Sequence, residues 1–95
     1  MKVKFYNIVI TLLLLQGITA QVMVKGVISD EMGIPLPGAS IVEQGTVNGV
    51  SSDFDGNYYI EVPQGSTLEF SFVGYGNQTF LVNERTGLDV TLFPD

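Results

Sequence analysis

The stretch Ser51-Ser52-Asp53-Phe54-Asp55-Gly56-Asn57-Tyr58-Tyr59-Ile60 joins an acidic turn to a run in which apolar and polar residues alternate. The carboxylates of Asp53 and Asp55 can accept hydrogen bonds from nearby backbone N–H groups, and Gly56 can supply the positive φ that ends such a turn. With a period of two, one face of the run then carries Tyr58, Ile60 and Val62. The stretch therefore predicts a tight turn that leads into a half-buried β-strand.

Short runs of the same kind recur along the chain, separated by Gly, Pro, Asn and Asp, and no helical period appears after residue 20. They predict strands over Met23–Ser29, Ala39–Glu43, Gly49–Ser52, Asn57–Val62, Thr67–Val73, Gln78–Val82 and Leu88–Phe93. Seven short strands at this spacing are typical of an all-β, antiparallel two-sheet sandwich, as in immunoglobulin-like domains. The expected core is Ile28, Ile41, Tyr58, Ile60, Leu68, Phe70, Phe72, Phe80, Val90 and Leu92.

The first twenty residues differ from the rest of the chain. Lys2 and Lys4 give a positive start, residues 8–15 form a short apolar run, and Ala20 is a small residue of the kind that precedes a cleavage site. A membrane anchor is the alternative, but a helix that spans a bilayer needs about 20 apolar residues, more than this run offers. We therefore expect residues 1–20 to be a secretory signal peptide and residues 21–95 to form one domain.

The domain after the expected cleavage site is strongly acidic. It keeps Lys25 and Arg85 against all ten acidic residues, which is two positive charges minus ten negative ones, or −8. Such a surface repels phosphate backbones and anionic lipid, so we expect no nucleic-acid partner and no direct membrane insertion of this domain. The chain has no Cys, so no disulfide can supplement its core, and lipid attachment to a cysteine is excluded.

The composition lacks the residues on which many catalytic sites depend. The chain has neither His nor Cys, so nucleophile–base pairs that use them are excluded, and we expect a protein that is not an enzyme. The Asp53–Asn57 segment resembles the start of a calcium-binding EF-hand loop, but the twelfth position, where a bidentate Glu is needed, is Gln64. A structural turn is favoured and weak metal binding is the alternative. We predict no catalytic, metal or cofactor-binding residues and no cofactor.

A group of aromatic residues near the fifth and sixth expected strands allows two interpretations. It could form a platform for carbohydrate, or it could belong to the core, which the inward positions favour for three of its members. Between two glycines, Tyr75 can pack its ring while its hydroxyl reaches a partner or water. The group consists of Phe70, Phe72, Tyr75 and Phe80.

Several spaced blocks, taken together, resemble a known family. They are Val24–Asp30, Gly33–Ile41, Gly45–Thr46, Ser52–Tyr58 and Leu68–Tyr75. In this order they are similar to the carboxypeptidase-regulatory-like domain, which implies a transthyretin-like β-sandwich over nearly all of the chain after the leader.

Directly behind a signal peptide, the chain most resembles the N-terminal extension of SusC/RagA-like TonB-dependent receptors, which are Gram-negative outer-membrane transporters of glycans and other large nutrients. The resemblance implies a non-catalytic accessory domain in the periplasm or at the outer membrane. The implied partners are the receptor barrel and the TonB-type periplasmic machinery, with an exposed sheet edge as the expected docking surface.

The chain reaches Asp95 without the TonB-contacting segment, plug and barrel that follow this extension in the family. We therefore expect either a truncated receptor or a free-standing module. The sequence also allows two other functions. The domain could be an exported glycan- or protein-binding module, or a regulatory appendage of an exported peptidase.

Overall fold

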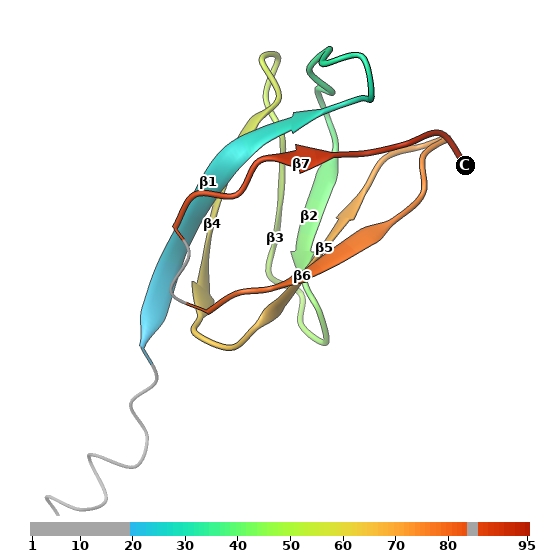
Figure 1. Ribbon diagram of the computed structural model, residues 1–95. Helices are drawn as coiled ribbons and strands as arrows, with labels where there is room; N and C mark the ends of the chain where they lie inside the picture. The colour runs from blue at the N-terminus through green and yellow to red at the C-terminus, as the bar shows by residue number, and fades with distance from the viewer. Residues whose placement is uncertain (1–19, 84–85) are drawn as a thin grey trace, which may run out of the picture.

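The computed structural model describes residues 20–83 and 86–95, which form β-strands and turns without a helix (Figure 1). The expected signal peptide lies, apart from Ala20, outside the described residues. The strands are β1 (Gln21–Ser29), β2 (Ser40–Glu43), β3 (Gly49–Ser51), β4 (Asn57–Pro63), β5 (Thr67–Ser71), β6 (Gln78–Leu81) and β7 (Val90–Thr91). All seven fall within the runs that the alternating pattern predicts, or extend them by one or two residues.

The strands form two sheets, as a sandwich requires. One has the order β4-β1-β7 and the other the order β3-β2-β5-β6. The expectation of a purely antiparallel sandwich is wrong for one pair, because β7 runs parallel to β1. A hairpin forces antiparallel neighbours, whereas the chain reaches β7 by crossing over from β6 in the other sheet, which leaves its direction open.

Two strands, β5 and β7, are shorter than predicted by two residues or more, because side chains and turns replace the ladder. β5 ends at Ser71 rather than Val73, since the chain turns there and the N–H of Tyr75 donates to the carbonyl of Phe72 at 3.0 Å. β7 covers two residues rather than six. Just before it, the Asp89 carboxylate accepts the N–H of Val27 at 2.9 Å, in a place where a backbone carbonyl would continue the ladder.

Tyr58 fastens the segment before β7 to the first sheet. Its buried hydroxyl donates to the carbonyl of Leu88 at 2.6 Å. Burial, and secondarily the negative charge of Asp89, raise the pKa of the Tyr58 hydroxyl well above its ordinary value. Gly26 lets the segment approach, because a Cβ at that position would lie 2.0 Å from the Leu88 carbonyl oxygen. The C-terminal segment therefore depends on close packing as much as on strand pairing.

The core lies between the sheets and is centred on Phe70, whose ring makes edge-to-face contacts with Tyr58 at 5.3 Å and Phe80 at 5.7 Å. Eight of the ten expected core residues are buried. Phe72 and Phe80 are half-buried and pack against the margin of the core, because Phe72 lies in the turn after β5 and Phe80 lies on an edge strand. The remaining buried apolar residues are Val24, Leu36, Ala39, Val62, Val82 and Leu88. Among residues 20–83 and 86–95, all the buried apolar side chains fall between Val24 and Leu92.

Candidate functional site

The Asp53 turn is built as the sequence predicts, with one difference. One carboxylate oxygen of Asp53 accepts the N–H groups of Asp55 and Asn57 at 3.0 and 2.9 Å, and Gly56 has a φ of +77°. Asp55 contributes its N–H to this turn rather than its carboxylate. Within residues 20–83 and 86–95 there is no group of three or more His, Cys, Asp or Glu that could hold a metal ion. One Asp53 carboxylate oxygen is thus engaged with two backbone N–H groups of its own turn.

A second turn repeats this geometry. One carboxylate oxygen of Asp30 accepts the N–H groups of Met32 and Ile34, both at 2.9 Å, and Gly33 has a φ of +81°. The shared spacing Asp-x-x-Gly-x is visible in the sequence and could have identified the pair. Both turns project from the same end of the sandwich, at the top of Figure 1. Their shared design indicates that the acidic residues here build the fold.

The aromatic group predicted near β5 and β6 belongs to the core and its margin. Phe70 is fully buried, while the rings of Phe72 and Tyr75 pack against each other at 5.7 Å and are half-buried. These positions match the packing interpretation, and the group offers no open aromatic platform in the described structure.

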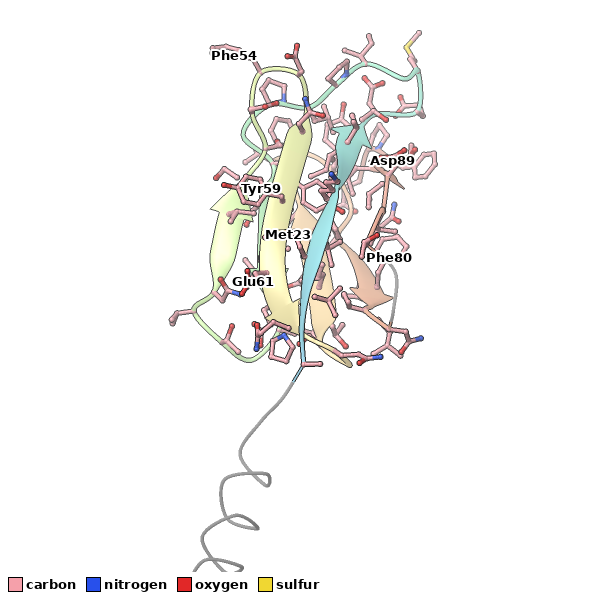
Figure 2. All side chains as sticks on the ribbon, turned by 90° about the vertical axis from the view of Figure 1, so that its left-hand side faces the viewer. Met23, Phe54, Tyr59, Glu61, Phe80 and Asp89 are labelled. Atoms are coloured by element: carbon pink, nitrogen blue, oxygen red, sulfur yellow. The ribbon has the colours of Figure 1, made fainter. Side chains whose placement is uncertain are left out.

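An open groove of about 900 Å³ lies on the outer face of β4 and β1 and continues onto β3. Its most prominent side chain is Tyr59, which is 68% exposed and sits across the strand pair from Lys25. In Figure 2, Tyr59 lies between β4 and β3, with Met23 and Glu61 nearby on the same face. The residues that line the groove include Met23, Lys25, Val27, Val50, Asp53 and Tyr59. We refer to it as the Tyr59 groove.

The groove lies over a seam where an edge strand of one sheet meets an edge strand of the other. β4 is an edge strand of the first sheet and β3 is an edge strand of the second. The described structure shows one hydrogen bond directly between β4 and the segment leading into β3, from the Asn48 side-chain amide to the carbonyl of Glu61 at 3.0 Å. The groove thus follows the seam between the two edge strands, and the sequence did not predict it.

The groove differs in composition from a nucleophilic active site. The groove combines apolar side chains with backbone groups at a sheet edge, whereas nucleophilic catalysis needs a nucleophile and a base within hydrogen-bond reach. In the part of the chain that the structure describes, no helix is long and apolar enough to cross a membrane. Fold and groove together define a small β-sandwich with a mainly apolar groove on one outer face.

Comparison with known proteins gives this class a family. The model of the CarboxypepD_reg-like domain matches residues 24–93, and the chain belongs to this family. The resemblance inferred from the spaced sequence blocks is thereby confirmed, and so is the all-β sandwich that it implies.

The curated relatives are much longer proteins. TonB-dependent receptor P39 of Formosa agariphila is 40% identical over 77 residues, which cover 80% of this chain and 7% of that protein. TonB-dependent receptor P3 of the same organism is 44% identical over 70 residues, or 73% of this chain and 7% of the relative. TonB-dependent receptor SusC of Bacteroides thetaiotaomicron is 43% identical over 58 residues, or 61% of this chain and 6% of the relative. The chain thus spans about 7% of the length of the relatives it matches.

Proposed function

We propose that this domain is a non-catalytic accessory domain of a TonB-dependent outer-membrane receptor for nutrients such as glycans, and that it acts in the periplasm by binding a partner. The observation that carries the proposal is the identity of 40–44% to proteins named TonB-dependent receptors, which extends over most of the domain. The choice of transported nutrient belongs to the rest of the receptor, because this domain corresponds to such a small part of its relatives.

Export is the first requirement of this function. A positive start, a short apolar run and Ala20 together favour cleavage between Ala20 and Gln21. β1 begins at Gln21, so the cut would release the sandwich with its first strand complete. Mass spectrometry of the periplasmic protein should find Gln21 at its N-terminus, and recovery of the intact Met1 form would contradict export by this route.

The partners follow from the place of such a domain in a receptor. We infer that it contacts the receptor barrel or the TonB-type periplasmic machinery, because both are within reach of a periplasmic domain attached to an outer-membrane transporter. The acidic surface, with ten acidic residues in the whole chain against Lys25 and Arg85 in the domain, favours a protein partner over nucleic acid or anionic lipid.

An in-frame deletion tests the proposal. Residues 21–95 are removed from a full-length receptor that carries this domain, the leader is retained, and the amount of barrel in the outer membrane is matched by surface labelling. We expect the barrel to assemble and nutrient uptake to fall. Unchanged uptake together with unchanged complex formation would show that the accessory role is wrong.

A further inference from the structure

We propose that the free edge of β6 pairs with β6 of a second copy of this chain, so that two β3-β2-β5-β6 sheets join into one across a two-fold axis. The inference goes beyond the proposed function and does not depend on it, because it concerns the association of the domain with itself. It rests on the open backbone groups of β6, on the absence of protecting side chains along this strand and on the distribution of charge.

The ladder between β2, β5 and β6 fixes which backbone groups of β6 point outward. The N–H of Gln44, just after β2, donates to the carbonyl of Thr67, so Thr67 and its alternate residues on β5 bond toward β2. The residues between them bond toward β6, where Phe80 is their partner at the centre of the strand. Thr79 and Leu81, on either side of Phe80, therefore direct their N–H and C=O groups away from β5. In the part of the chain that the structure describes, these groups make no hydrogen bond.

No second strand lies beside this edge in the described structure. Among the described strands, only β5 comes within 8 Å of β6, Cα to Cα. Just before β6, the N–H of Gly76 donates to the carbonyl of Phe93, so the C-terminal segment closes the edge at that point. From there β6 and the segment that contains β7 diverge, as Figure 1 shows. The edge is therefore open along β6 itself, from Gln78 to Leu81.

The other edge strands are bridged by side chains, whereas β6 is unprotected. Asn48, before β3, donates its side-chain amide to the carbonyl of Glu61 on β4, and Gln78 donates its side-chain amide to the carbonyl of Thr91 on β7 at 2.6 Å. Proteins commonly protect a free edge with a charged residue or a proline. Residues 77–83 read Asn-Gln-Thr-Phe-Leu-Val-Asn and contain neither. An exposed edge of this composition is a template for another strand.

The open groups are arranged so that a second copy fits them. Thr79 and Leu81 flank Phe80 symmetrically, so an antiparallel pair centred on Phe80 brings Thr79 of each copy opposite Leu81 of the other. Each such pair exchanges two backbone hydrogen bonds. The same pairing places the half-buried Phe80 rings of both copies beside each other at the margin of the core, where each covers apolar surface of the other.

The distribution of charge permits contact at β6 and opposes it elsewhere. The domain carries −8 after the expected cleavage, so two copies repel each other over most of their surfaces, but β6 itself is uncharged. The carboxylate on the neighbouring strand belongs to Glu69, opposite Thr79. In the joined sheet the two Glu69 residues stand at least three strand spacings apart, or about 14 Å, which exceeds the Debye length of about 8 Å at physiological salt. A short strand pair of this kind makes a weak dimer, with a Kd on the order of 0.1–1 mM, which added salt tightens.

Self-association of the exported protein tests the inference. The full chain is expressed with its leader, purified from the periplasm, and followed by sedimentation equilibrium and amide hydrogen exchange from about 20 µM to about 2 mM. Thr79→Pro removes an outward N–H that β5 does not use, and Thr79→Val, which keeps this N–H, is its matched control. Leu81→Glu adds a carboxylate to the edge, and Tyr59→Glu adds the same charge at an exposed residue of β4.

We expect a dimer at the high end of this range, in which the amides of Thr79 and Leu81 become protected as the protein concentration rises, while the amide of Phe80 is protected throughout. Raising the salt from about 50 mM to about 500 mM should tighten the association several-fold. Thr79→Pro and Leu81→Glu should each weaken it by about tenfold or more, and their controls by less than about threefold.

Three results would overturn the inference. They are a protein that stays monomeric at about 2 mM, concentration-dependent protection that lies away from β6, and equal weakening by Leu81→Glu and Tyr59→Glu. The glutamate pair keeps the inference testable if Thr79→Pro fails to fold. Uptake by a receptor that lacks the domain reports on the proposed function alone, so the two proposals can fail separately.

Discussion

Replacing Gly56 by alanine should destabilise the domain by about 3–4 kcal/mol, far more than a substitution at an exposed turn usually costs. Gly56 has a φ of +77°, which costs an L-residue about 1–2 kcal/mol. A Cβ there would also lie 2.5 Å from the carbonyl oxygen of Ile28 and 3.0 Å from Cβ of Pro35, so the backbone must shift.

That shift would disturb two hydrogen bonds, from the Ile28 N–H to the Gly56 carbonyl and from the Leu36 N–H to the Ile28 carbonyl. Each contributes about 1 kcal/mol, which brings the total to about 3–4 kcal/mol. A domain of this size has a stability of roughly 4–11 kcal/mol, so the substitution should consume much of it. Gly56→Val should cost more, since a β-branched residue resists positive φ further.

Gly33 provides a matched control inside the same chain. It occupies the same place in the second turn, with a φ of +81° and the same hydrogen bonds, but a Cβ added there would have nothing within 4 Å. Gly33→Ala should therefore cost only about 1–2 kcal/mol, the conformational part of the penalty. Urea unfolding followed by circular dichroism measures both variants. Equal midpoints for Gly33→Ala and Gly56→Ala would refute the argument from close approach.

Three further predictions follow from the core and the site. Phe70→Ala should cost about 3–5 kcal/mol and come close to unfolding the domain, because the ring is fully buried; an unchanged melting temperature would contradict its central place. Millimolar calcium should change the melting temperature little, and a large rise that Asp55→Ala abolishes would instead establish a metal site. Tyr58→Phe should cost about 1–3 kcal/mol, because it leaves the buried Leu88 carbonyl without its donor. Folding raises the pKa of the Tyr58 hydroxyl from 10.0, because the ionised form is disfavoured in the buried site. The stability that this hydroxyl contributes is therefore fully present below pH 10 and is lost as the pH rises beyond it. The urea midpoints of the native chain and of Tyr58→Phe should accordingly converge above pH 10.

The alternation of apolar residues was enough to predict the strands, since one buried face leaves a period of two in every run. It could not predict where each strand lies in its sheet. Phe80 has an inward position by its period, yet it is half-buried because β6 is an edge strand. Leu36 is buried from a proline-rich link that has no period at all, and nothing local in the sequence indicates that it packs.

The candidate site was predicted only in part for a related reason. The Asp53 turn depends on groups within five residues of each other, so the sequence could specify it, and only the part played by Asp55 differs. The Tyr59 groove depends on β3 and β4 lying beside each other without pairing. An outward position on a strand looks the same in sequence whether it faces bulk water or a groove, so Tyr59 could not be distinguished from an ordinary exposed residue.

The central claim is that the domain serves its receptor by binding and not merely as a spacer. The most direct test is the rate of nutrient uptake by cells whose full-length receptor carries Tyr59→Ala in the groove, compared with Val47→Ala outside it and with deletion of residues 21–95 at equal barrel levels. Both side chains are exposed, so neither substitution should unfold the sandwich. We predict that Tyr59→Ala lowers uptake toward the level of the deletion while Val47→Ala leaves it unchanged. Normal uptake with Tyr59→Ala, alongside loss of uptake on deletion, would contradict the claim.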